Sequence, residues 1–133
     1  MTDLGIVRAD ERSAPFFEAA GRDELLIKRC PACGHWLAPE ATACSGCGGA
    51  ELGWAAASGR GVLVAWAVPH SGKAAAGGVL ALVELDEGPW LHTRLDRVDT
   101  DAGAGGLRAG LGVAAHFVHP AGGESYPVFR VTA

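Results

Sequence analysis

The stretch that decides the fold is Cys30-Pro-Ala-Cys33 followed by Cys44-Ser-Gly-Cys47, which together contain all the cysteines of a 133-residue chain. Their spacing is C-x2-C-x10-C-x2-C. Two residues between cysteines let a tight turn aim both thiolates at one ion, and two such turns complete a tetrahedron. The spacing therefore predicts a zinc site made by Cys30, Cys33, Cys44 and Cys47.

Three alternatives exist for the four cysteines: two disulfides, a redox C-x-x-C motif, and iron in a rubredoxin-like site. Redox motifs do not come in pairs at this spacing, and a reducing compartment keeps thiols free. Glycine follows each pair, Gly34 after the first and Gly48 after the second, where a positive φ is expected. Because four thiolates leave no open coordination position, we expect a structural ion rather than a catalytic one.

Charge and hydropathy exclude several classes of protein. The chain has 11 basic and 15 acidic residues, a net charge of −4, and its basic residues are scattered. Nucleic-acid-binding proteins usually concentrate positive charge on one face, so nucleic acid is an unfavoured ligand. The longest apolar run, 62–69, has the length of a strand, and the N-terminus has no long apolar region. We therefore expect a cytoplasmic protein without a membrane span or a secretory signal.

The N-terminal part predicts a helix and a small metal-bound sheet. Residues 13–26 are predicted to be helical, with Ser13 as N-cap and Pro15 in the first turn. Short strands are expected at 25–29 and 35–39 around the first cysteine pair and at 51–55 after the second. The sequence thus divides into an N-terminal helical segment at 1–24 and a zinc ribbon at 25–56, which is too small to fold without its ion.

From residue 57 onward the chain reads as short strands separated by glycine-rich turns. Along the first strand, Val64 and Trp66 are expected on one face and Leu63 and Ala65 on the other, so a central, curved strand is predicted. Five strands with a break after the third fit an OB-fold barrel over 57–133, with an SH3-like barrel as the alternative. The expected strands are 61–70, 78–85, 89–95, 113–119 and 126–131. The fold class is therefore mainly β, with an N-terminal helix, a rubredoxin-like zinc ribbon and a C-terminal five-stranded OB-fold barrel.

Candidate contact residues lie at the ends of the first barrel strand. Arg60, held between two glycines, suits a phosphate, with a solvated turn arginine as the alternative. His70 and Ser71 border the face that OB-folds use for binding, with a turn-capping role as the alternative for His70. Trp66 is expected in the barrel core or, as an alternative, at a partner surface. The cysteines are committed to metal and none of the five serines lies in a G-x-S-x-G motif, so no catalytic residue is predicted.

The remaining aromatic and histidine side chains have simpler expected roles. Two tryptophans, Trp36 and Trp54, flank the ribbon and are expected to cover the metal cluster. Trp90, like Trp66, is expected in the barrel core or, as an alternative, at a partner surface. The histidines outside the candidate set are expected at the surface or the barrel rim, and these are His35, His92, His116 and His119.

The order of these parts resembles a known family. It resembles the zinc-ribbon/OB-fold proteins encoded beside thiolases. The segments that carry the resemblance are, in order, Phe16-Phe17, Leu25-Leu-Ile-Lys-Arg-Cys-Pro-Ala-Cys-Gly34, Trp54 and Ser58-Gly-Arg-Gly61. The resemblance runs from about Pro15 to Phe129. It implies a non-catalytic accessory subunit of a thiolase-superfamily complex, of the thiolase, steroid side-chain aldolase or acyltransferase type.

The resemblance also implies partners and ligands. Such a subunit docks on a thiolase-like catalytic partner in a hetero-oligomer, and it helps to bind or shield the acyl-CoA thioester. Zinc is then the structural cofactor and acyl-CoA a shared ligand. Two alternatives remain: an independent acyl-CoA carrier, and an OB-fold nucleic-acid-binding module that would use arginines, namely Arg60, Arg94, Arg97 and Arg108.

Overall fold

The computed structural model describes residues 13–68, 79–96 and 107–132. It contains one short helix and eight strands in that part of the chain. Their bounds are α1 Ala14–Ala20, β1 Leu26–Arg29, β2 Trp36–Leu37, β3 Gly53–Ala56, β4 Arg60–Ala67, β5 Val79–Leu85, β6 Trp90–Leu95, β7 Gly112–Val118 and β8 Tyr126–Val131. Within these described residues, no helix has the length and hydropathy needed to cross a membrane.

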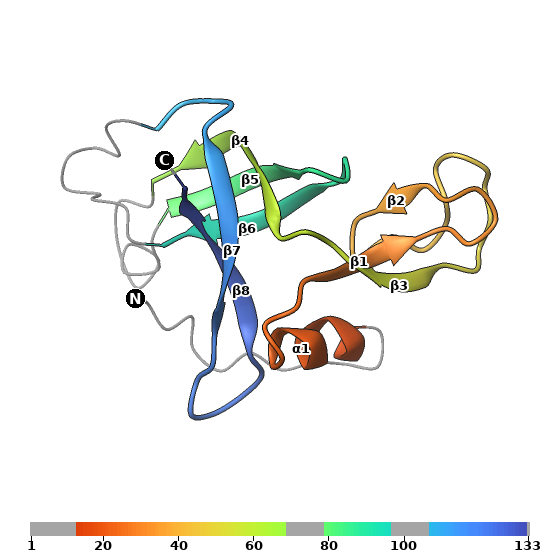
Figure 1. Cartoon of the computed structure of the whole chain (residues 1–133), viewed down its shortest axis with the longest axis horizontal. Helices are drawn as coiled ribbons and strands as arrows, with labels where there is room; N and C mark the ends of the chain where they lie inside the picture. Colours follow the sequence, from red (N-terminus) through yellow and green to blue (C-terminus); the bar gives the residue numbers. More distant parts are fainter. Residues whose placement is uncertain (1–12, 69–78, 97–106, 133) are drawn as a thin grey trace.

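The strands form two sheets. Strands β2-β1-β3 make a three-stranded antiparallel sheet, and β4-β5-β6-β8-β7 close into a barrel, as the sequence predicts. Figure 1 shows the small sheet beside the barrel, with α1 beneath the junction between the two. Neighbouring barrel strands are antiparallel except at the closure, where β6 and β8 run parallel and pair through Leu95 and Phe129. This closure is the shortest seam of the barrel.

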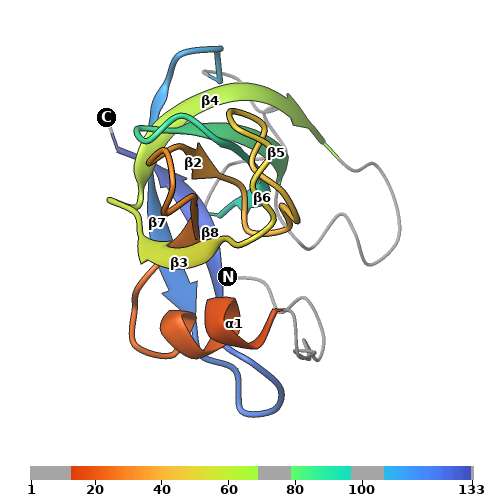
Figure 2. The ribbon, with the colours of Figure 1, turned by 90° about the vertical axis from the view of Figure 1, so that its right-hand side faces the viewer.

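One apolar core joins the barrel to the ribbon. Phe129 and Leu63 are fully buried inside the barrel, and Ile27 of β1 is fully buried in the same cluster. Leu25, just before β1, belongs to it too, and Phe16 of α1 packs against it. Viewed from the ribbon end in Figure 2, the small sheet lies in front of the barrel, with α1 below both. The ribbon is therefore anchored on the barrel through its central strand.

The helix is shorter than the predicted span of 13–26. It ends at Ala20, and a turn follows in which the N–H of Asp23 donates to Ala20 and that of Glu24 to Ala19. These two bonds form a Schellman motif, and Asp23 adopts its left-handed position with φ 59°. Backbone geometry after Gly21 thus stops the helix before the predicted strand begins.

The predicted alternation along β4 is wrong beyond Leu63. The register of β4 against β5 shifts between Leu63 and Ala65, so one extra residue interrupts the pairing. Leu63 lies opposite the buried Val83, and Trp66 lies opposite the buried Ala81, which puts both on one face. A β-bulge reverses the inward and outward alternation after it and bends the strand, so the predicted curvature has this local cause.

Candidate functional site

The four cysteine side chains converge at one end of the ribbon. Their sulfur atoms all lie within 4.8 Å of one another, and both Cys30–Cys47 and Cys33–Cys44 are 3.6 Å apart. A disulfide requires about 2.05 Å, and all four thiols are free. A tetrahedral zinc–thiolate site places its sulfurs about 3.8 Å apart, given Zn–S bonds of about 2.3 Å. The arrangement therefore fits zinc and disagrees with two disulfides.

The two cysteine pairs adopt the same turn. In the first, Gly34 N–H donates to Cys30 at 2.8 Å; in the second, Gly48 N–H donates to Cys44, also at 2.8 Å. Both glycines have φ 78°, which confirms the expected positive values. A side chain rarely adopts this conformation, so glycine lets each turn close around its sulfurs. The repeated turn is why one sequence pattern yields two equivalent halves of a metal site.

Backbone N–H groups polarise the cluster. The N–H groups of Cys47 and Gly46 lie 3.4 and 3.3 Å from the Cys44 sulfur, and they lower the pKa of that thiol from 9.0 to about 6. At Cys33 the N–H of His35 favours the thiolate, but the neighbouring thiols outweigh it and raise the pKa of Cys33 to about 11. Crowded thiolates repel one another, and a divalent cation removes that repulsion, so the donor set suits a bound metal.

Burial divides the four ligands into two classes. Cys30 and Cys44 are buried, whereas Cys33 and Cys47 are exposed. The apolar side chains packed around the buried pair are Leu37, Ala41 and Leu52. The prediction that Trp36 and Trp54 cover the metal cluster is wrong. Trp36 packs against the barrel core, and Trp54 lines a groove. Short aliphatic residues therefore provide the apolar cover of the buried sulfurs.

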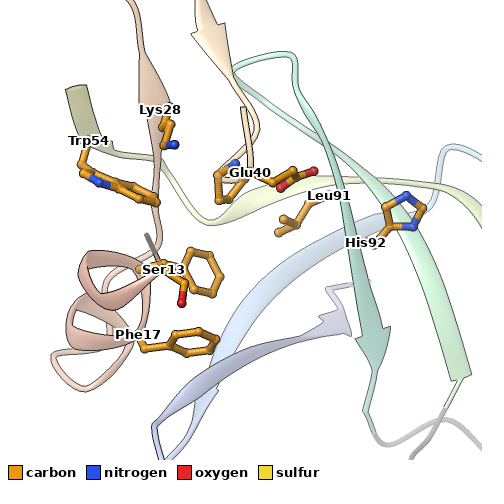
Figure 3. Close-up of a pocket in the computed structure, with 9 residues that line it drawn as sticks. Ser13, Phe17, Lys28, Glu40, Trp54, Leu91 and His92 are labelled. Atoms are coloured by element: carbon orange, nitrogen blue, oxygen red, sulfur yellow. The ribbon is translucent and has the colours of Figure 1, made fainter. Parts of the chain in front are cut away.

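One groove at the ribbon–barrel junction, the α1 groove, lies between α1, the ribbon and β6. It has a volume of about 450 Å³ and apolar walls that include Phe16, Phe17 and Trp54. Figure 3 shows Phe17 reaching into it from α1, with Lys28 and Trp54 on the ribbon side and Leu91 on β6. His92 lies on the other side of β6 from Leu91, as alternation along a strand requires. This volume is within the range of small-molecule sites.

Lysine and arginine side chains of β1 already have partners near this groove. The ammonium of Lys28 donates to the carbonyl of Ala41 at 2.7 Å and lies 5.1 Å from the centre of the Trp54 ring. The guanidinium of Arg29 lies 4.8 Å from the centre of the Trp36 ring. Both are cation–π contacts across the small sheet. They hold two half-buried tryptophan rings, of which Trp36 packs against the barrel core and Trp54 lines the α1 groove.

The second groove, the hairpin groove, lies between the first cysteine turn and the β5–β6 hairpin. It has a volume of about 480 Å³ and is lined by residues of both parts. Those residues are Gly34, His35, Trp36, Leu37, Ala38, Ser45, Glu87, Gly88, Pro89 and Trp90.

Family models assign both sheets to one family. Residues 17–53 match the model of the ChsH2 rubredoxin-like zinc ribbon domain, and residues 54–118 match the model of the ChsH2 C-terminal OB-fold domain. The chain belongs to the ChsH2 family. Membership identifies the closed barrel as an OB-fold rather than the SH3-like alternative, and it identifies the cysteine cluster as that of a zinc ribbon.

Individual relatives agree with this assignment. The chain is 30% identical to a chain of a solved structure described as an Ltp2-ChsH2(DUF35) aldolase, with a TM-score of 0.78. The match covers 94% of this chain and 98% of that one. It is 32% identical over 121 residues to a probable enoyl-CoA hydratase alpha subunit of Thermomonospora curvata. That match covers 89% of this chain but 37% of the relative, so this chain spans little more than a third of the relative's length.

A more distant structure shares the fold alone. It is a DUF35-family protein of unknown function from Sulfolobus solfataricus, with 12% sequence identity and a TM-score of 0.60. The match covers 93% of this chain and 87% of that one. The ribbon and barrel thus keep their arrangement at low sequence identity.

The two candidate contact residues that the structure describes, Arg60 and Trp66, do not lie together in this ChsH2-family chain. Arg60 begins β4 and is exposed, and its N–H donates to the Ser58 hydroxyl at 3.1 Å. Trp66 lies six residues further along the same strand, roughly 20 Å away at the usual rise per residue. Trp66 is 37% exposed and therefore lies outside the barrel core. His70 and Ser71 lie outside the described residues.

Sequence reasoning missed a chain of hydrogen bonds around His119. Its Nε2 lies 2.7 Å from the Asp23 carboxylate and its Nδ1 lies 2.8 Å from the Ser125 hydroxyl. These side chains come from the turn after α1 and from the loop between β7 and β8. Asp23 and His119 are 69% and 47% exposed, so water screens their contact. We call these three residues the surface tether. Among them, Asp23 has a left-handed backbone conformation.

Proposed function

We propose that this chain is a non-catalytic subunit that docks on a thiolase-fold catalytic partner and helps to shelter an acyl-CoA thioester. The observation that carries the proposal is the similarity to the ChsH2 chain of an Ltp2-ChsH2(DUF35) aldolase, which this chain matches over 98% of that chain's length. The similarity to a probable enoyl-CoA hydratase alpha subunit supports the same class of substrate. Reduced thiols that can bind zinc favour a cytosolic setting for this subunit.

The surface of the barrel supports a protein partner. Among the described residues, the exposed large apolar side chains are Trp66, Leu80, Trp90 and Val131. Two of them are tryptophans, which are enriched at the energetic centres of protein interfaces. Apolar surface of this kind favours a partner protein over the nucleic-acid module that the fold also suggests.

The chemistry of the chain supports a catalytic partner. All four cysteines of the sequence are in the metal cluster, so the chain has no spare thiol nucleophile. A four-thiolate zinc site has no open position for substrate, so zinc would hold the ribbon in shape through Cys30, Cys33, Cys44 and Cys47. The nucleophile and the acid and base groups would then belong to the partner.

We further propose the division into a helical segment at 1–24, a ribbon at 25–56 and a barrel domain at 57–133. The two sheets support it, because β1–β3 lie within the second range and β4–β8 within the third. Ile27 nevertheless packs in the barrel core, so the ribbon and barrel would act as one docking unit.

Co-expression tests the proposal directly. A tagged copy of the chain is co-expressed with a candidate thiolase-fold protein from the same genome, and the pair is analysed by affinity capture and size exclusion. We expect a stable complex at fixed stoichiometry, with a partner that is less active or less stable alone. A partner that is fully stable and active alone contradicts the proposed accessory role.

The α1 groove provides a sharper variant within that complex. Phe17→Ala removes an aromatic wall of the groove, and we expect it to raise the KM for acyl-CoA several-fold while kcat changes less. Val118→Ala is the control, because Val118 is a half-buried apolar residue of β7 that neither lines that groove nor belongs to the exposed apolar set. Equal KM values for both variants would show that the α1 groove does not contribute to acyl-CoA binding.

Two titrations of the isolated zinc-loaded chain separate the alternatives. An independent acyl-CoA carrier would bind acyl-CoA in calorimetry without any partner, whereas the proposal expects no such binding. A nucleic-acid module would retard single-stranded DNA at low salt, with affinity that falls steeply as salt rises. We expect no retardation.

A further inference from the structure

The hairpin groove contains a carboxylate with unused hydrogen-bonding capacity. One oxygen of Glu87, Oε2, accepts the backbone N–H of Ser58 at 2.7 Å. The other, Oε1, is buried, and it has no hydrogen-bond partner among the residues that the structure describes. A buried carboxylate oxygen without a donor is costly. An ionised carboxylate offers about four acceptor positions, so Glu87 can accept from a further donor while Oε2 keeps its bond to Ser58.

The groove also contains an exposed aromatic side chain. Trp90 lines the same groove and is 51% exposed, and its indole N–H donates to Glu84 at 3.3 Å. Two other tryptophan rings of this chain carry a cation over one face, since Lys28 lies over Trp54 and Arg29 lies over Trp36. Within residues 13–68, 79–96 and 107–132, those are the two cation–π contacts, so the Trp90 face has no cation over it there.

The charge of the hairpin favours a cation as well. Glu84, Asp86 and Glu87 place three carboxylates within four residues of the β5–β6 hairpin. Arg29, whose partner Trp36 lines the same groove, is held by the Gly34 carbonyl at 3.1 Å and by the Trp36 ring. A second cation from outside the chain would therefore meet a negative hairpin and an open indole face.

We infer that the hairpin groove binds a guanidinium, the side chain of an arginine of the docked protein partner. The guanidinium pairs with Glu87 and stacks on Trp90. Arginine fits better than lysine because its planar group forms two parallel bonds to a carboxylate and stacks on an aromatic ring. This inference rests on the proposed function only in assigning the arginine to the catalytic partner; the groove itself can be tested without one.

The test uses the full zinc-loaded chain labelled with ¹⁵N. N-acetyl-arginine methylamide is titrated while the four indole N–H resonances are followed, with Trp90 assigned by its loss in Trp90→Phe. We expect a saturable shift of the Trp90 resonance, with a dissociation constant roughly in the millimolar range for a single side chain. N-acetyl-citrulline methylamide, a neutral isostere, should cause no saturable shift. Equal shifts with both compounds would overturn the inference.

Variants identify the carboxylate. Glu87→Gln keeps an oxygen for the Ser58 N–H and removes the charge, so we expect binding about tenfold weaker. Glu51→Gln is the matched control, because Glu51 is an exposed glutamate that lines neither groove, and the affinity of this variant should be unchanged. If Glu87→Gln alters the fold, Trp90→Ala gives the second test, with binding followed by the remaining resonances of the groove. Unchanged affinity in either folded variant overturns the inference.

The same variants distinguish this inference from the proposed function. If the arginine compound binds but no thiolase-fold partner is captured, guanidinium binding by the hairpin groove is supported and the proposed function is contradicted. If the partner is captured equally well by wild type, Glu87→Gln and Trp90→Ala, and the titration shows no binding, the groove inference fails alone. If both hold, the two variants should weaken capture several-fold, and Glu51→Gln should not.

Discussion

The ribbon and the barrel bury their side chains by different means. The ribbon's own buried cluster consists of Cys30, Leu37 and Cys44, of which two are metal ligands. The barrel is filled by aliphatic residues and Phe129, and it also takes in Ile27 from the ribbon. The small sheet thus has almost no apolar core apart from the one it shares. Its shape depends on the metal at one end and on the barrel at the other.

This difference divides the expected responses to mutation. Loss of metal should be severe for the ribbon and mild for the barrel, whereas loss of barrel packing should affect both. The predictions below are ordered from the largest expected effect to the smallest, and each compares the two regions.

Removal of a buried metal ligand should have the largest effect. Cys44→Ser removes a sulfur that is buried and bound by two backbone N–H groups, and structural zinc supplies on the order of 10 kcal/mol to such sites. We expect loss of stoichiometric zinc and loss of amide dispersion for the ribbon in ¹H–¹⁵N spectra, with the barrel resonances retained. Chelation of wild type should have the same effect. Collapse of all resonances together would show that the two regions fold as one unit.

Loss of the central barrel side chain should come next. Phe129 is fully buried and pairs with Leu95 at the short parallel seam, so Phe129→Ala should cost about 3–5 kcal/mol. We expect this loss in urea unfolding monitored by circular dichroism, with stoichiometric zinc still bound in the folded state. A loss below 1 kcal/mol would mean that the seam is not the packed centre of the barrel.

The junction should give a smaller, shared effect. Ile27 is fully buried between the ribbon and the barrel, and Ile27→Ala should cost about 2–4 kcal/mol. Because the side chain belongs to both regions, the ribbon and barrel resonances should broaden or shift together. Lys28→Ala is the control at the next position of β1, whose side chain lies on the ribbon surface against Ala41 and Trp54. A response of the ribbon alone to Ile27→Ala would contradict the shared core.

The surface tether should matter least. His119→Ala removes contacts to Asp23 and Ser125 that are largely solvent-exposed, so we expect a loss of less than about 1 kcal/mol. Asp23→Gly breaks one of the same contacts but relieves a left-handed backbone with φ 59°, so its net effect should be close to zero. Both values can be measured by thermal unfolding. A loss above 2 kcal/mol for His119→Ala would give the tether a larger role than its exposure indicates.

Local sequence patterns predicted the metal site in detail. The spacing of the cysteines and the glycines after them gave the four ligands, the two turns and the positive φ at Gly34 and Gly48. They did so because a metal turn is a contact between residues close in sequence. The strands of the barrel were predicted for the same reason, since alternation and turn residues are local signals.

Contacts between distant segments were beyond the sequence patterns. Nothing in the alternation of β4 indicates the bulge that turns Trp66 to the same face as Leu63, because the bulge depends on pairing with β5. The turn at Asp23 likewise takes its partner from His119, 96 residues later. Both junction grooves are also products of packing, since each combines ribbon and barrel residues.

The sequence by itself therefore determined the metal cluster, the order of the strands and the family resemblance. Tertiary structure alone decided that Ile27 of the ribbon completes the barrel core and that Glu87, with its unpaired oxygen, and the exposed Trp90 line one groove. The physical reason is range. Turns and strand alternation follow from neighbouring residues, whereas burial and hydrogen-bond pairing depend on which distant segments the closed barrel brings together.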